Sequence, residues 1–311
     1  MEKKKSGGMD AVLAALAANV LVAISKFVGF AFSGSTAMLN ESIHSVVDCS
    51  NQVLLLFGDK LAKREQSDLH QFGEARAKYF FSMLVATLLF FGGGALGVYE
   101  AINKILHPAH EVANHGLVIG ILLFAILVES FSLRVAFKEI NELNEEKLSL
   151  FKFLKESRHS EIIIVFIEDF CAIFGLLLAL GATILAMITG NAIYDAIGGL
   201  FIGLLLMVAA IFLAKEFYSL IVGERVNEAD LNKIKKAFAR DDVQRIIDIK
   251  TVHLGPTEIL IAAKIDLLDI KEDQGYDIIN DIERNIRKEI ADKKCYIYIE
   301  LDKFVEDYKR I

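Results

Sequence analysis

Two ionisable residues that are four positions apart, His44 and Asp48, stand inside a stretch that otherwise reads as a membrane-spanning helix. On a helix this spacing places both side chains on one face, one turn apart, where they could hold the same small cation. A charged group at bilayer depth is costly, so its presence there predicts a functional site. We therefore take this pair as the centre of the predicted chemistry.

A later apolar run contains two adjacent acids, Glu168 and Asp169. Two carboxylates at that depth must face a partner, a metal ion or water, because facing lipid is too costly. One imidazole and two or three carboxylates could complete a four-coordinate zinc site, and manganese, iron(II) and cobalt are also chemically possible. The alternative is a buried His–Asp hydrogen bond that only fastens two helices. The predicted metal site is His44, Asp48, Asp169 and Glu168.

Other ionisable residues accompany the apolar runs. Glu129 is either a proton-carrying or supporting acid inside the bundle, or a solvated residue near a helix end. Glu41 and Asp195 are expected to be solvated at the outer ends of their helices. Lys26 is the only fixed cation well inside the runs, and we expect it to bond to another helix or to snorkel toward water.

A polar segment after the second apolar run offers a possible second metal site. Asp68, His70 and Glu74 occur within seven residues, and their side chains are all potential metal ligands. The same residues also suit a polar turn that leads into a helix. Both interpretations stay open at this point.

The composition is that of a polytopic helical membrane protein. Hydrophobic residues make up 54% of the chain, mean hydropathy is +0.44, and there are only two prolines in 311 residues. Three scattered cysteines make a disulfide framework improbable, and a net charge of −7 gives no reason to expect nucleic acid as a partner. No nucleophile and base form a credible pair, so we do not expect an enzyme.

Six stretches approach the roughly 20 apolar residues that a bilayer-spanning helix needs. Lysine and arginine gather in the loops on one side, which predicts that both termini are cytoplasmic. The opposite loops near residues 34 and 190 are so short that those helices must pair as tight hairpins. The predicted spans are residues 10–33, 36–58, 78–101, 115–136, 161–188 and 193–214.

From about residue 217 the composition becomes that of a soluble domain. A capped amphipathic helix near Asn227 is followed by patterns typical of two strands, a helix and a third strand. The order αββαβ predicts a small α+β domain with its helices on one face of a sheet. The predicted domains are an all-α transmembrane bundle of six helices at 1–216 and a cytoplasmic domain at 217–311. The strands are expected at 243–253, 259–268 and 296–301, and the second helix at 271–290.

These features together resemble the cation diffusion facilitators, the zinc transporter family. The resemblance rests on His44-x-x-x-Asp48, on Asp169, on Asp68-x-His70-x-x-Gly73 and on the C-terminal αββαβ pattern. It implies a homodimer that exports divalent cations in exchange for protons, with a ferredoxin-like cytoplasmic domain that helps the dimer form.

The chain departs from the family pattern at three places. The histidine that usually precedes the fifth-span aspartate by four positions is Val165 here, and Glu168 supplies a possible replacement, as in the branch that resembles the mitochondrial zinc transporters. Adjacent helix positions point about 100° apart, so Glu168 cannot simply occupy the lost position. Glu74 stands where a loop histidine is usual. The C-terminal domain is poor in histidine and cysteine, which argues against a binuclear metal sensor.

We therefore expect a proton-coupled divalent cation efflux antiporter, with Zn²⁺ as the first choice of cargo and no resident cofactor. Its expected partners are the metal ion, protons, the lipid bilayer and a second copy of the chain. The rivals are a manganese, iron or cobalt exporter and a metal-binding membrane subunit that does not transport. The lack of an obvious presequence favours a bacterial inner membrane.

Overall fold

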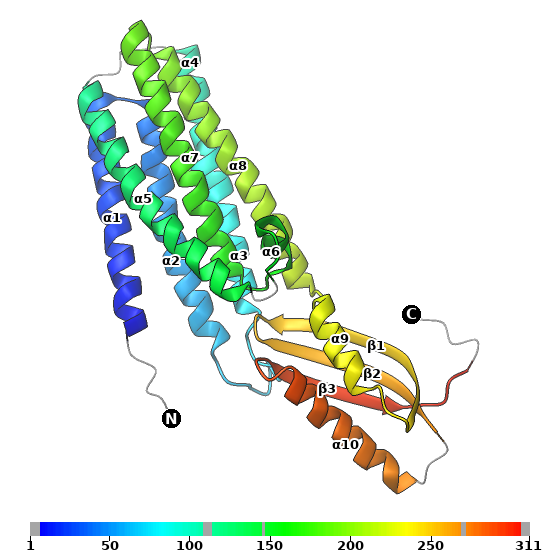
Figure 1. Ribbon diagram of the computed structural model, residues 1–311. Coiled ribbons are helices and arrows are strands. Elements are labelled where there is room, and N and C mark those ends of the chain that lie inside the picture. The colour runs from blue at the N-terminus through cyan, green and yellow to red at the C-terminus, as the bar shows by residue number, and fades with distance from the viewer. Residues whose placement is uncertain (1–6, 108–113, 145–146, 269–271, 306–311) are drawn as a thin grey trace. The chain divides into compact units, whose positions relative to one another are not determined.

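The chain separates into two compact units in a computed structural model that describes residues 7–107, 114–144, 147–268 and 272–305 (Figure 1). Side chains are described from residue 19 onward, except at 272 and 273. We name the two parts the helical unit, Met1–Lys60 with Phe80–Phe217, and the mixed unit, Leu61–Tyr79 with Tyr218–Ile311. The lysines at positions 3–5 that support the predicted orientation lie outside the described residues.

Long helices make up most of the helical unit, and neither proline falls within a described helix. In Figure 1 the long helices run alongside one another, and α5 packs against both α1 and α7. The short helix α6 lies in a region where the sequence predicted only a loop. The helices are α1 (Gly7–Ser33), α2 (Thr36–Ala62), α3 (Ala77–Leu88), the π-helix η1 (Leu89–Ala95), α4 (Leu96–Leu106), α5 (His115–Leu143), α6 (Leu150–Glu156), α7 (Ser160–Thr189) and α8 (Ile193–Val222).

Two glycines let consecutive helices turn back on each other. Gly34 lies between α1 and α2 with φ +65, and Gly190 lies between α7 and α8 with φ +66. This left-handed backbone is open to glycine because it has no Cβ. The tight hairpins predicted near residues 34 and 190 are therefore confirmed.

Among the residues that the structure describes, four helices are long and apolar enough to cross a membrane. They are Ala77–Leu106, which combines α3, η1 and α4, and then α5, α7 and α8. The described part of α1 gives a shorter apolar helix, Asn19–Ser33. Helix α2 is more polar, because it carries His44 and Asp48 together with further charged residues. The described residues thus form a long helix at each of the six predicted spans. Four of these helices are long and apolar enough to cross a membrane.

The π-helical segment η1 interrupts the third long helix. It contains three consecutive glycines, and Gly94 among them lies close to α8. A Cβ added at Gly203 of α8 would lie 2.8 Å from the backbone nitrogen of Val98 and 3.0 Å from the carbonyl oxygen of Gly94. Close approach of helix backbones through small residues is a common way of packing within a membrane. Gly94 and Gly203 therefore allow these two helices to pack closely.

Gly203→Ala is expected to destabilise the helical unit by about 1–3 kcal/mol, because the new methyl group meets backbone atoms that cannot rotate away. The measurement is the thermal denaturation midpoint of the purified protein, which should fall. Gly181→Ala is the matched control, since no atom lies within 4 Å of a Cβ at that helical position. Equal midpoints for the two variants would contradict this account of the contact.

In the mixed unit, two helices pack on one face of a three-stranded sheet in the predicted order αββαβ. Strand β1 pairs antiparallel with β2, and β2 pairs parallel with β3, so the sheet order is β1-β2-β3. A parallel pair needs a crossover connection, and α10 supplies it. The elements are α9 (Glu228–Ala237), β1 (Val243–Gly255), β2 (Glu258–Leu267), α10 (Glu272–Glu289) and β3 (Lys294–Leu301). Lys271, the predicted first residue of the second helix, lies outside the described residues.

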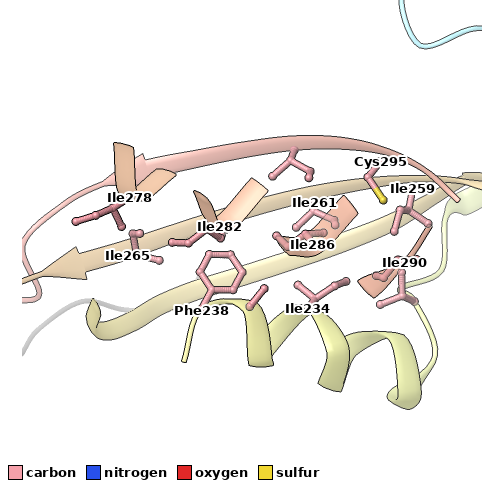
Figure 2. Packing of buried hydrophobic residues seen from close by; sticks show 14 residues of the cluster. Ile234, Phe238, Ile259, Ile261, Ile265, Ile278, Ile282, Ile286, Ile290 and Cys295 are labelled. Atoms are coloured by element: carbon pink, nitrogen blue, oxygen red, sulfur yellow. The ribbon is translucent and has the colours of Figure 1, made fainter. Parts of the chain in front are cut away.

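The core of the mixed unit is built mainly from isoleucine. Figure 2 shows alternate residues of β2, Ile259, Ile261 and Ile265, facing isoleucines of α10 and Phe238. Alternate strand residues point to the same face, which explains why every second position of β2 is buried. The isoleucines of α10 and of its C-terminal end, Ile278, Ile282, Ile286 and Ile290, recur at the helical spacing seen in the sequence.

The segment Leu61–Tyr79 belongs to the mixed unit, although in sequence it lies between two long helices. Phe72 packs edge-on against Tyr296, with ring centroids 5.2 Å apart, and Gln66 donates a 2.6 Å hydrogen bond to the Tyr296 hydroxyl. Arg76 donates to the carbonyl oxygen of His253 at 3.2 Å. Contacts with β1 and β3 therefore hold this segment on the sheet.

Candidate functional site

His44 and Asp48 lie together on α2, as their spacing predicts. The Nδ1 atom of His44 is 3.5 Å from Oδ1 of Asp48, and the side chains are 1% and 16% exposed. Neither ring nitrogen of His44 has a hydrogen-bond partner, and neither does Oδ1 of Asp48. Buried polar atoms are almost always satisfied, so an imidazole with both nitrogens unbonded is a chemically unusual group. A metal cation that binds one of these nitrogens and the carboxylate would satisfy both residues.

Glu168 and Asp169 on α7 turn toward different helices. Asn51 of α2 donates a 2.5 Å hydrogen bond to Oε1 of Glu168, which is buried. Ser132 of α5 donates a 2.7 Å hydrogen bond to Oδ2 of Asp169. This divergence follows from the rotation of about 100° between adjacent helix positions. Glu168 is therefore the acid that is directed toward the helix carrying His44 and Asp48.

The four predicted site residues form a connected but not compact arrangement. Asn51 follows Asp48 by three positions, so the residue that binds Glu168 shares the helix face of the His–Asp pair. The charges of Glu168 and, more weakly, Asp169 act on Asp48. Within the described residues, no group of three or more His, Cys, Asp or Glu side chains is close enough to hold a metal ion. The complete four-residue set remains a prediction.

Glu41, which the sequence suggests is solvated, is completely buried. Its Oε2 accepts a 3.0 Å hydrogen bond from Nζ of Lys26, and both side chains are 0% exposed. The expectation of solvation was wrong because Glu41 faces α1, where Lys26 supplies a countercharge. The bond from Lys26 to another helix, one of two roles expected for it, is confirmed.

Asp195 was also expected to be solvated, and it is buried as well, at 1% exposure. Its carboxylate accepts 2.5 Å hydrogen bonds from the Ser35 hydroxyl and from the backbone nitrogen of Thr36. The first backbone N–H groups of a helix have no partner within the helix, and a carboxylate both bonds them and complements the helix dipole. Asp195 of α8 thus caps α2 and fixes the end of the helix that carries the site.

Glu129 on α5 is buried, at 8% exposure, so the solvated interpretation was wrong. Its charge acts on Asp48, and the charge of Lys26 acts on Glu129. It is therefore an acid inside the bundle and within electrostatic range of the His–Asp pair.

The possible second site, in the segment Leu61–Tyr79, is only partly assembled. Nδ1 of His70 is 3.6 Å from Oε1 of Glu74, and Nη1 of Arg64 is equally distant from the same oxygen. The His70 side chain is 50% exposed, and Asp68 is exposed too. A carboxylate shared with an arginine on a solvated segment fits the polar-turn interpretation better than a metal site.

Cys295 and His253 of the mixed unit are poorly placed to act as metal ligands. Burial raises the pKa of the Cys295 thiol above its usual range, which keeps it protonated, whereas metals bind the thiolate. His253 is buried, and its Nδ1 lies 3.2 Å from the carbonyl oxygen of Gly255.

Sequence reasoning did not single out Asn51 or Ser132, the two residues that bind the α7 acids. A signal for Asn51 was present, since it lies on the same helix face as Asp48. Ser132 gave no comparable signal, because serine is common in membrane helices as a packing residue. The contact of Ser132 with Asp169 depends on how α5 and α7 pack against each other.

Comparison with known proteins identifies the wider group. The model of the cation efflux transmembrane domain matches residues 12–222. The chain is 28% identical over 257 residues to the mitochondrial proton-coupled zinc antiporters SLC30A9 of Homo sapiens and Xenopus laevis, covering 82% of this chain. It is 30% identical over 261 residues to metal tolerance protein C4 of Arabidopsis thaliana, again over 82% of this chain.

The chain spans about half the length of these relatives, 45%, 46% and 56% for the human, frog and plant proteins. The match to the family model nevertheless covers well over half of the chain and includes every predicted site residue. The relatives are named as transporters or metal tolerance proteins rather than as enzymes. The chain therefore belongs to the cation efflux family, and several of its helices are long and apolar enough to cross a membrane.

Proposed function

We propose that this protein is a proton-coupled antiporter that exports divalent metal cations, with Zn²⁺ as its main cargo. The observation that carries the proposal is the buried His44–Asp48 pair, whose imidazole nitrogens have no hydrogen-bond partner within a bundle of the cation efflux family. The name of the SLC30A9 relatives, proton-coupled zinc antiporters, supports the same choice of ion and coupling.

His44 and Asp48 bind the cargo in this proposal, and Glu168 and Asp169 complete its coordination from α7. Imidazole and carboxylate bind metal only when they are deprotonated, so metal and protons compete for the same atoms. Exposure of the site to alternate sides of the membrane would then let opposing gradients drive the exchange. Glu129, buried and within electrostatic range, is proposed as a further proton-carrying or supporting acid.

The proposed architecture has six membrane spans, with α1 and α2 added to the four strongly apolar ones, and both termini in the cytoplasm. The mixed unit is proposed to be a ferredoxin-like cytoplasmic domain that supports a homodimer. Helix α2 can cross the bilayer despite its charges because Glu41 and His44 are buried within the bundle and Asp48 is only 16% exposed.

A manganese, iron(II) or cobalt cargo is the second candidate. Three carboxylates and a single histidine lie around the proposed site, and oxygen-rich sites suit harder ions better than thiolate or multi-histidine sites do. Zinc remains the first choice because the mitochondrial relatives are named for it.

The test is metal uptake by proteoliposomes that carry an imposed pH gradient, measured separately for zinc, manganese, iron(II) and cobalt. Zinc uptake is expected to depend on the gradient and to stop when an ionophore collapses it; protein-free vesicles are the control. Metal binding without gradient-driven uptake of any of the four ions would instead favour a non-transporting metal-binding subunit.

A further inference from the structure

A buried lysine lies close to the proposed cation site. Among the side chains that the structure describes, Lys26 is the only lysine or arginine that is buried, and its ammonium is 3.0 Å from Glu41. A lysine in such a place must be paired, because an isolated buried charge is too costly. The pairing with Glu41 explains how the buried charge of Lys26 is tolerated. The position of Lys26 near the proposed site suggests its role.

Glu41 shares a helix face with the cation pair. It precedes His44 by three positions and Asp48 by seven, so all three lie along one stripe of α2. The other oxygen of Glu41, Oε1, is buried without a hydrogen-bond partner. It lies 2.6 Å from the point that a Cβ on Gly175 of α7 would occupy, so that glycine leaves room for the carboxylate.

The charge of Lys26 reaches beyond its partner. It acts on His44 and Asp48 of α2 and on Glu129 of α5. In a medium of low effective dielectric constant, a unit charge several ångströms away changes the binding energy of a cation substantially. A transporter also needs a site that binds its ion well enough to load and weakly enough to release it.

From this geometry we propose that Lys26 is a tethered cation that sets the affinity of the adjacent site for its divalent cargo, with Glu41 as the partner that balances its charge. The inference rests on the proposed function. It makes Lys26 a positioning and affinity-determining residue that does not touch the metal. Its ammonium opposes the approach of a second cation, and its bond to Glu41 keeps that carboxylate from joining the cargo site.

The test compares zinc binding by calorimetry and gradient-driven zinc uptake for three variants of the full chain. Lys26→Met leaves the Glu41 charge uncompensated, so zinc should bind about tenfold tighter while uptake at saturating zinc slows. Glu41→Gln leaves excess positive charge and should weaken binding about tenfold. The double variant Lys26→Met, Glu41→Gln removes both charges and should return the affinity to within about twofold of the wild-type value.

Lys104→Met is the matched control. It removes a lysine from α4 that donates a hydrogen bond to the carbonyl oxygen of Gly34 and that feels the charges of Asp195 and Glu100. A monodisperse elution profile checks folding for each variant. If Lys26→Met does not fold, Glu41→Gln and the double variant still decide the question.

Unchanged zinc affinity in the folded single variants would overturn the inference, because charge balance would then have no effect on the site. Weaker binding in Lys26→Met without recovery in the double variant would overturn it as well, since that pattern indicates a purely structural lysine. Wild-type protein that binds none of the four metals would contradict the proposed function itself, and this inference with it.

Discussion

Asp48→Asn is expected to reduce gradient-driven zinc uptake at least about 100-fold and to weaken zinc binding to a similar degree. The substitution keeps the size of the side chain but removes the negative charge next to His44, whose Nδ1 lies 3.5 Å from the carboxylate. Loss even of residues that only orient metal ligands costs 10–100-fold in affinity, so loss of a charged ligand should cost at least as much. Uptake into proteoliposomes and calorimetric titration with zinc are the two measurements.

Asp59→Asn is the control for that experiment. It removes an acid from the same helix, close to the end of α2 that is predicted to be cytoplasmic. It should leave zinc binding within about twofold of the wild-type value. If Asp48→Asn transported zinc as well as Asp59→Asn does, the cargo site would have to lie elsewhere in the bundle.

Glu168→Gln and Asp169→Asn are each expected to weaken zinc binding about tenfold or more, because each substitution removes one of the four proposed ligands of the dication. Both substitutions preserve an acceptor oxygen, so the hydrogen bonds from Asn51 and Ser132 can persist and the fold should survive. The readout is the zinc dissociation constant, together with uptake under a pH gradient.

Glu161→Gln, near the start of the same helix, is the matched control, since Glu161 lies 3.8 Å from His159 rather than near Asp48. Full binding after Glu168→Gln combined with loss after Asp169→Asn would remove Glu168 from the ligand set. Full binding after both would exclude α7 from the site.

The sequence alone determined the elements and the pair at the centre of the site. Uninterrupted apolar runs predicted the long helices, and alternating β-branched residues with helical isoleucine spacing predicted the αββαβ order of the mixed unit. The contact between His44 and Asp48 was predictable for the same reason: it is a local consequence of helix geometry over four residues.

Only the tertiary structure decided which residues meet across helices. The sequence suggested that Glu41 and Asp195 are solvated acids at helix ends. In the structure, Lys26 pairs with Glu41, and the start of α2 binds Asp195. The bonds from Asn51 to Glu168 and from Ser132 to Asp169 were equally absent from any local pattern. Helical periodicity specifies the face on which a residue lies, but its partner depends on helix packing. In this protein, packing brings together groups that are 15 to 159 residues apart in sequence.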